Sequence, residues 1–211
     1  MRIKDDKNKS YWNKIYMDIA DKEIKYDLWL DKFKSIFNEY KGTEIVDLGC
    51  GTGNNCLYLS ELGYSVVACD YSTEALKIVN KYLPKVKILE FDFTKDFPFE
   101  NASVNIIIAD LSLHYFSEKI TKKILSNIRR ILTKGGYLIL RVNSINDTNY
   151  GAGNGVEVER HLYDTKYGYK RFFDEKDIKY FCGEWNILHL KENKIYRYGM
   201  EKYVFEVVLM N

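Results

Sequence analysis

The chain of 211 residues lacks several features, and each absence excludes a class of protein. Proline occurs only at Pro84 and Pro98, and no stretch has the low-complexity composition of a disordered linker. No run approaches the roughly 18 apolar residues of a membrane-spanning helix. The polar start, MRIKDDKNKS, lacks the apolar centre of a signal peptide. We therefore expect a cytoplasmic protein that has no membrane partner.

Net charge and cysteine content are also small. A formal net charge of +2 gives no overall attraction to nucleic acid, so we do not expect a nucleic-acid partner. The four cysteines, Cys50, Cys56, Cys69 and Cys182, contain no CxxC pair, and the three histidines show no matching metal spacing. We expect no metal site and four reduced thiols. A reactive thiol at Cys50 is the alternative, because this residue lies in a glycine-rich segment.

Apolar residues recur along the chain with the periods of helices and strands. Hydrophobic residues make up 46% of the chain and charged residues 29%, which is enough for a buried core. After amphipathic helices within residues 11–40, the pattern predicts strands at 44–48, 65–69, 86–91, 104–109, 137–142, 185–190 and 202–210. It predicts helices at 54–62, 73–83, 119–132 and 174–182. This alternation is typical of an α/β fold with helices on both faces of a mostly parallel seven-stranded sheet. The last two strands, with no helix between them, are expected to form an antiparallel pair at the C-terminal edge.

Short side chains mark the ends of the predicted helices. Gly63 is expected to follow the helix at 54–62 as its terminating glycine, and Ser72 or Thr73 to cap the next helix. The run Lys134-Gly135-Gly136 is expected to end the helix at 119–132.

The segment from Glu44 to Gly53, EIVDLGCGTG, carries the most specific motif. A predicted strand ends at Leu48, and Gly49, Gly51 and Gly53 then alternate before a helix begins. Glycine lets such a loop turn tightly and lets a ligand approach its backbone. Ligands of open α/β sheets bind at the carboxyl ends of the strands. Asp70 ends the next strand, where a carboxylate can accept hydrogen bonds from both hydroxyls of a ribose.

Two details distinguish this loop from the GxGxxG loop of nicotinamide-dependent oxidoreductases, which is a competing interpretation. Asn54 stands where that pattern requires a third Gly or Ala. Asp47 precedes the first glycine, and a negative charge there would repel a pyrophosphate. The same charge suits a ligand that bears an ammonium and a sulfonium group.

The string VDLGCGTGNN, with CDYS after the second strand, resembles the motifs of class I S-adenosylmethionine-dependent methyltransferases. The resemblance covers about residues 40 to 142 and implies a three-layer α/β/α Rossmann-like fold, S-adenosylmethionine as the cofactor and methyl transfer as the activity. A looser resemblance, in 57–64 and 172–185, is to tellurite-resistance-type small-molecule methyltransferases. The cofactor-binding residues that the family implies are Trp12, Tyr16, Asp47, Gly49, Cys50, Gly51, Asn54, Asp70, Tyr71, Ser72, Asp92, Phe93, Asp110 and Leu111.

Within this set the family assigns roles to several positions. Asp47, Gly49 and Gly51 would line the methionine part, with Asp47 acting through its backbone or through water. Asp70 would hold the ribose, and Asp92 would recognise the adenine amino group. The segment Asp110 to Phe116, DLSLHYF, would lie between cofactor and acceptor.

Two residues of that segment are the candidate catalytic residues, on the acceptor side. These are His114 and Tyr115; a buried structural histidine and an aromatic wall are the alternatives. Residues 143–173 show no strong period and are expected to form an irregular acceptor loop, with a surface loop as the alternative. The polar and aromatic residues expected to contribute from it are Tyr150, Glu157, Glu159, Arg160, His161, Tyr163, Tyr167, Tyr169 and Arg171.

Together these expectations describe one methyltransferase domain. Residues 1–40 form a helical cap, 41–142 the cofactor-binding core, 143–173 the acceptor loop and 174–211 a C-terminal helix and strand pair. The expected partner is a small-molecule methyl acceptor, because the fourth strand ends in ADLS and lacks the Asn/Asp-Pro-Pro-aromatic motif of base methyltransferases. An RNA or protein methyltransferase and a non-catalytic S-adenosylmethionine-binding protein are the alternatives. The acceptor atom and the oligomeric state are left open.

Overall fold

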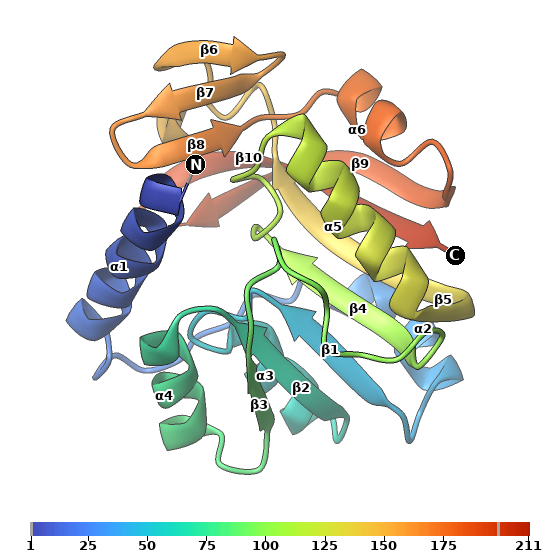
Figure 1. Ribbon diagram of the computed structural model, residues 1–211. Helices are drawn as coiled ribbons and strands as arrows, with labels where there is room; N and C mark the ends of the chain where they lie inside the picture. The colour runs from blue at the N-terminus through green and yellow to red at the C-terminus, as the bar shows by residue number, and fades with distance from the viewer. Residues whose placement is uncertain (1, 198) are drawn as a thin grey trace.

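The computed structural model describes the backbone of residues 2–197 and 199–211, and their side chains from residue 9 onward (Figure 1). Its helices are α1 (Arg2–Asp18), η1 (Asp31–Phe33), α2 (Lys34–Glu39), α3 (Asn54–Glu61), α4 (Thr73–Tyr82), α5 (Glu118–Ile131), η2 (Thr148–Tyr150) and α6 (Glu175–Phe181). Its strands are β1 (Glu44–Leu48), β2 (Ser65–Asp70), β3 (Lys87–Glu90), β4 (Val104–Asp110), β5 (Leu132–Asn143), β6 (Val156–Glu159), β7 (Leu162–Thr165), β8 (Gly168–Arg171), β9 (Asn186–Arg197) and β10 (Met200–Met210). No helix in these residues is long and apolar enough to cross a membrane.

Seven of these strands form one sheet in the order β3-β2-β1-β4-β5-β10-β9, which we call the central sheet. Strands β1 to β5 run parallel, whereas β10 is antiparallel to both β5 and β9. The predicted α/β fold with an antiparallel C-terminal edge pair is thereby confirmed. Because the order reverses between β1 and β4, the carboxyl ends of these two strands flank the point where open α/β sheets bind ligands.

The central sheet is covered on both faces, as its apolar strands require. In β4, Ile107 packs in one core with α5 and α6, whereas Ile106 and Ile108 pack in the other with α2, α3 and α4. Successive side chains of a strand point to opposite faces of the sheet, so a continuous run of isoleucines packs into the cores on both faces. Figure 1 shows α5 and α6 in front of the sheet and α2 and α3 behind it.

Two of the three predicted helix ends are confirmed. The Ser72 hydroxyl accepts a hydrogen bond from the Ala75 N–H and caps α4, and Gly63 follows α3 with φ +81°. The expected stop at Lys134 to Gly136 is wrong, because α5 ends at Ile131 and these residues lie within β5. They accompany a register shift between β4 and β5. A Cβ on Gly136 would lie 2.9 Å from the Asn105 carbonyl oxygen, so the glycine permits a close strand contact.

The prediction of an irregular segment at 143–173 is also wrong. This segment contains η2 and a second, antiparallel sheet of β6, β7 and β8, which we call the small sheet. Each of its strands spans four residues, too few for an alternating pattern to be recognised in the sequence. Figure 1 shows the small sheet beyond the carboxyl ends of the central strands, near the N-terminal end of α1.

Candidate active site

A cavity of about 1220 Å³ lies at the carboxyl ends of β1 to β4. Its wall is formed by the loop after β1, the ends of β2, β3 and β4, one side of α1, and the β7–β8 hairpin. Figure 1 shows the arrowheads of β1 and β4 pointing toward the side on which α1 lies. Cavities for one drug-sized ligand measure about 300–1,000 Å³. This cavity can therefore hold two small molecules side by side.

The glycine loop between β1 and α3 forms the floor of the cavity. Gly49, Gly51 and Gly53 have φ values of +74°, +54° and +86°, which side chains other than glycine rarely adopt. The N–H groups of Gly49 and Cys50 both donate to the Cys69 carbonyl, at 2.7 and 3.0 Å, and so fix the loop to the end of β2. Gly49 itself lines the cavity, whereas Gly51, which was also expected at the cofactor, is not part of its wall. The predicted tight turn is present, and the absence of a side chain there exposes backbone to a ligand.

Asp70, at the end of β2, is the most fixed carboxylate on the cavity wall. Its Oδ2 accepts from the Gly51 N–H and its Oδ1 from the Ser72 N–H, both at 2.9 Å. Burial nevertheless raises the pKa of Asp70 above its usual range. A carboxylate oxygen can accept more than one hydrogen bond. Asp70 therefore keeps capacity for ligand hydroxyls in a position set by two backbone groups.

The loop after β3 contributes a second carboxylate and an apolar surface. The Asp92 Oδ1 accepts from both the backbone N–H and the hydroxyl of Thr94, at 2.8 Å each. Phe93 is buried, and its ring lies 5.6 Å from that of Phe91. All four residues line the cavity, as does Glu90, whose place on the wall we did not predict.

Helix α1 closes one side of the cavity with aromatic rings. Trp12 stacks on Tyr16 at 5.8 Å and meets Tyr115 edge-on at 5.6 Å. The Tyr11 ring lies 5.4 Å from that of Tyr167 in the β7–β8 hairpin, so α1 and the small sheet meet over the cavity. The positions of Trp12 and Tyr16 in the cavity wall agree with the expectation from the sequence.

The other predicted residues divide into those on the wall and those behind it. Asn54, Tyr71, Leu111 and Tyr115 line the cavity. Leu111 has φ +54°, an uncommon backbone conformation for a branched residue, directly after β4. Such conformations cluster where a chain is held at a functional site.

Asp47 and Cys50 were expected at the cofactor but are absent from the cavity wall. The Asp47 carboxylate is fully buried beneath the glycine loop, 3.5 Å from the Asn55 amide nitrogen and 3.3 Å from the Cys56 thiol. Burial raises the pKa of Asp47 to about 7. Cys50 is buried too, and its neighbour Cys56, together with burial, holds the pKa of its thiol well above the usual value. The alternative of a reactive thiol at Cys50 is therefore not supported.

The Asp110 side chain was also expected near the cofactor, but Arg141 binds it instead. The Arg141 guanidinium donates to both oxygens of the Asp110 carboxylate and also to Asp27. Burial alone would raise the pKa of Asp110, but the attraction of Arg141 outweighs burial and lowers it. Arg141 comes from the neighbouring strand β5, whose register places it beside Asp110.

Ser72 and His114 are two further corrections. The Ser72 hydroxyl caps α4 and donates to Asn13 of α1 at 2.6 Å, so it joins two elements and does not line the cavity. His114 is 2% exposed and lies behind Tyr115, with their ring centroids 4.1 Å apart. Burial, and then nearby cationic groups, hold the pKa of His114 well below its usual range. The imidazole is therefore neutral, and the interpretation as a buried histidine is favoured over a base that touches the acceptor.

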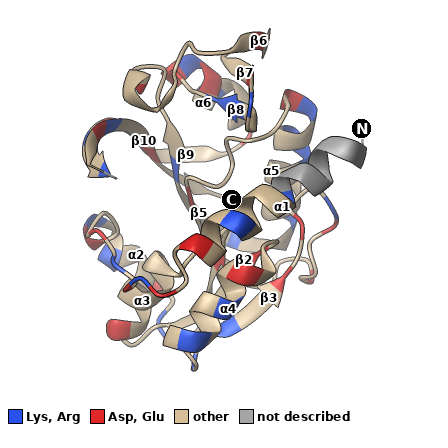
Figure 2. Ribbon diagram, turned by 90° about the vertical axis from the view of Figure 1, so that its left-hand side faces the viewer, with Lys and Arg blue, Asp and Glu red and all other residues tan. Residues whose placement is uncertain are grey.

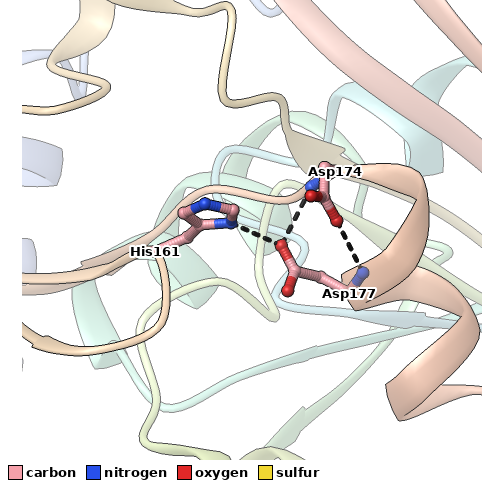
Figure 3. Close-up of side chains that lie close together, drawn as sticks. All are labelled: His161, Asp174 and Asp177. Atoms are coloured by element: carbon pink, nitrogen blue, oxygen red, sulfur yellow. Dashed lines mark hydrogen bonds and ion pairs between the residues drawn. The ribbon is translucent and has the colours of Figure 1, made fainter.

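Most of the polar residues expected to contribute from 143–173 bind one another or α6. Glu159 pairs with Arg171, and Arg160 pairs with both Asp174 and Asp177 of the α6 capping box. His161 Nδ1 lies 2.6 Å from the Asp177 carboxylate (Figure 3). His161, Asp174 and Asp177 form a cluster, and both of its carboxylates already bind the Arg160 guanidinium. The cluster thus fixes the small sheet to α6 and is not available as a ligand set.

The small sheet does contribute to the cavity, through a different set of side chains. Tyr169 of β8 and Tyr167 of the β7–β8 turn line it, as the sequence suggested, and so does Lys170 of β8, which was not predicted. Tyr150, at the end of η2, lines it too. Whether a residue of β8 faces the cavity depends on how the strand pairs with its neighbour. Because β8 spans only four residues, its alternating pattern could not be recognised in the sequence, and Lys170 was missed. Figure 2 shows basic residues in β8 and acidic residues where β2 and β3 end.

The sequence is similar to known methyltransferases. The family model of a methyltransferase domain matches residues 46–140. An uncharacterized methyltransferase of Oceanobacillus iheyensis is 23% identical over 200 residues, which cover 93% of this chain and 86% of that protein. The probable S-adenosylmethionine-dependent methyltransferase TehB of Haemophilus influenzae is 25% identical over 153 residues. That match covers 71% of this chain and 48% of TehB, so the chain corresponds to about half of that protein.

Solved structures show the same fold. A methyltransferase structure from Anabaena variabilis superposes with a TM-score of 0.70 at 18% identity, covering 98% of this chain and 94% of the other.

The site itself fits the cofactor of these enzymes. The glycine floor leaves space for a methionine chain, Asp70 and Asp92 offer acceptors, and Phe93 offers an apolar surface for an adenine ring. The matched sequence, the strand order and these residues on the cavity wall agree with one another. Together with the matched methyltransferase domain and the similar proteins, they support a class I S-adenosylmethionine-dependent methyltransferase.

Proposed function

We propose that this methyltransferase acts on a small molecule, which binds beside the cofactor in the cavity under α1. The cavity carries the proposal, because its volume of about 1220 Å³ suits two small ligands and because Tyr11 and Tyr167, whose rings lie 5.4 Å apart, join α1 to the β7–β8 hairpin along its wall. Residues 1–40 then act as a cap, 41–142 as the cofactor-binding core, and the small sheet within 143–173 as the acceptor side of one domain with the C-terminal segment 174–211.

The residues on the wall have distinct roles in this proposal. Asp70 accepts hydrogen bonds from the ribose hydroxyls, and Asp92 accepts one from the adenine amino group. Tyr71 and Phe93 pack on the adenine ring, and Gly49 presents its backbone to the methionine part. Trp12 and Tyr16 cover the bound cofactor and exclude water. Asn54 and Leu111 complete the wall, and Tyr115 separates the cofactor side from the acceptor side.

Bound S-adenosylmethionine supplies a methyl group that its positively charged sulfur already activates. The protein therefore needs to align the acceptor and exclude water, and such positioning can supply roughly 7–11 kcal/mol of barrier reduction. A base is needed only where the acceptor must lose a proton. This accounts for a site in which the buried, neutral His114 does not reach the cavity.

The alternatives make different demands on the site. One relative is named as a tRNA N(3)-methylcytidine methyltransferase, from Drosophila melanogaster, and another as a demethylmenaquinone methyltransferase, from Lactococcus lactis, so relatedness does not choose between acceptors. A small molecule fits within the volume of the cavity, whereas a macromolecular acceptor needs a surface around the cavity that binds it. A binder without activity would hold the cofactor and transfer nothing.

Labelled methyl transfer tests the acceptor class. Purified protein is incubated with methyl-labelled S-adenosylmethionine and, separately, with RNA, protein and small-molecule fractions of a cell extract. We expect label only in the small-molecule fraction. Label in RNA, with binding that weakens steeply with salt, would contradict the proposal, and so would cofactor binding without transfer to any fraction.

The role of Asp70 is tested by calorimetric titration with S-adenosylhomocysteine. Hydrogen bonds to charged groups contribute about 1.5–3 kcal/mol, so Asp70→Asn is expected to weaken binding by about 10–100-fold. Asp96→Asn is the control, because the Asp96 side chain is 94% exposed and does not line the cavity. Unchanged affinity in a folded Asp70→Asn protein would refute the assigned role.

A further inference from the structure

Lys170 places a half-buried ammonium group on the acceptor side of the cavity. Its Nζ donates to the Tyr150 carbonyl at 2.6 Å and lies 5.2 Å from the centre of the Phe172 ring. An ammonium group has three donors, and one of them is used in this hydrogen bond. Within the described residues, no carboxylate lies at ion-pair distance from Lys170, whereas Lys202 pairs with Asp147 and Lys9 with Glu90.

The nearest acidic group is already occupied. Asp147 is fully buried, and its Oδ2 binds the Lys202 Nζ at 2.6 Å while its Oδ1 accepts from the Tyr203 N–H at 3.1 Å. Lys202 repels Lys170, and burial together with this repulsion lowers the pKa of Lys170 to about 8. The Asp147 carboxylate also attracts the charge of Lys170, but burial and Lys202 together outweigh this attraction, and the hydrogen bonds of Asp147 go to Lys202 and Tyr203.

Other cationic groups lie near Lys170, and the described carboxylates among them, Asp110 and Asp147, bind cationic side chains other than Lys170. Arg197 lies 3.8 Å from Asp110, but Arg141 already binds both oxygens of that carboxylate. His114 lies close enough for Lys170, Lys202 and Arg197 to disfavour its protonation. The acidic residues on the cavity wall lie on other elements: Asp70, Glu90 and Asp92 lie at the ends of β2 and β3 and in the loop after β3, and Glu23 lies in the segment after α1, where it pairs with Lys25.

We propose that the methyl acceptor carries an anionic group, a carboxylate or a phosphate, and that Lys170 binds this group. The inference rests on the proposed small-molecule function and specifies its substrate class. A buried charge without a partner is costly, so an arriving anion gains a partner that the folded protein does not provide. The strand that carries Lys170 is joined to the segment after β4 by the hydrogen bond from the Arg171 N–H to the His114 carbonyl, and Tyr115, Phe116 and Tyr169 of these two segments line the cavity, which suits an acceptor with an apolar body.

Binding of three matched probes tests the inference. The full chain, saturated with S-adenosylhomocysteine, is titrated by calorimetry with benzoate, phenyl phosphate and the neutral benzamide. We expect one or both anions to bind about tenfold or more tightly than benzamide, since a charge-assisted hydrogen bond is gained. The stronger of the two anions distinguishes a carboxylate acceptor from a phosphate acceptor.

Variants then assign the preference to Lys170. We expect Lys170→Gln to lower the affinity for the anions to that for benzamide, while Lys170→Arg retains a preference for them. Lys166→Gln is the matched control, because it removes the same charge from the same hairpin at an exposed position that does not line the cavity. Affinity for S-adenosylhomocysteine should be unchanged in all three variants. Unchanged affinity also shows that the variants are folded.

Three results would overturn the inference: benzamide binding as tightly as the anions, an anion preference that survives Lys170→Gln, or no anion binding to the cofactor-loaded protein. Each leaves the small-molecule proposal standing. Conversely, methyl transfer to RNA would refute that proposal whatever the probes do, so the two failures are distinguishable.

Discussion

Arg141 and Asp110 form a two-pronged ion pair across neighbouring strands, with Nε 2.6 Å from Oδ1 and Nη2 2.7 Å from Oδ2. The Arg141 guanidinium also lies 4.4 Å from the centre of the Trp29 ring, and the residue is 1% exposed. The pair lies directly behind Leu111, so it fixes the end of β4 from which the cavity wall continues.

Removal of Arg141 should therefore destabilise the protein. Breaking a buried ion pair typically costs about 3–5 kcal/mol, because one charge is left buried without a partner. We expect a loss of this size for Arg141→Met in urea unfolding, and partial recovery when Asp110→Asn is added. Arg129→Met is the control, since Arg129 pairs with the exposed Glu184 and should lose about 1 kcal/mol or less. Equal losses in the two single variants would contradict this account.

A methyl group at Gly49 should disturb the floor of the cavity. An Ala Cβ there would lie 2.4 Å from the Ser112 Cβ, and φ is +74°. We expect Gly49→Ala to lose both stability and affinity for S-adenosylhomocysteine. Gly42→Ala shares a positive φ but has open space around it, so it should cost only the backbone strain of about 1–2 kcal/mol and leave affinity unchanged. Adding Ser112→Gly to Gly49→Ala removes the clash and should restore part of the affinity; no recovery would show that the clash is not the cause.

The stability of the protein should depend on pH through Asp47. The pKa of Asp47 is raised to about 7, so between its ordinary value of 3.8 and 7 the folded state holds a proton that the unfolded state has lost. Stability from this group therefore falls as pH rises through that range and is constant above it. Between pH 5 and pH 8 we expect the free energy of unfolding of Asp47→Asn, relative to that of the natural protein, to rise by about 3 kcal/mol.

Urea unfolding of both proteins at the two pH values measures this difference. Asp96→Asn, at an exposed position, should show no such change. If the difference in free energy of unfolding between the two proteins stayed constant from pH 5 to pH 8, Asp47 would be ionised in the folded protein over this range.

The aromatic side of α1 should support cofactor binding. Trp12 contacts Tyr16 and Tyr115, and aromatic pairs contribute about 0.5–1.5 kcal/mol each beyond the area they bury. We expect Trp12→Ala to weaken S-adenosylhomocysteine binding by about tenfold in calorimetric titration. Met17→Ala, on the same helix but 63% exposed, should bind normally. Similar losses in both variants would indicate that α1 as a whole had come loose.

The helices and strands of the central sheet and the position of the glycine loop could be predicted from the sequence, whereas the small sheet could not. The apolar run VNIIIA and the alternating glycines are local signals, because strand periodicity and positive φ constrain residues one position at a time. For the same reason Asp70 was found, since it directly ends an apolar strand. The β5 start at Leu132 was missed, because the glycines before Tyr137 indicate a turn equally well.

Four aspartates at or near the ends of strands looked alike in the sequence, and only the tertiary structure separated them. Asp70 and Asp92 face the cavity, Asp110 binds Arg141, and Asp47 is buried beneath the loop. The sequence by itself determined the sheet, its glycine loop and the family, because these depend on short-range patterns. Which carboxylates and cations stay available to a ligand depends on partners 30 or more residues away, such as Arg141 for Asp110 and Lys202 for Asp147, and those partners meet only in the folded chain.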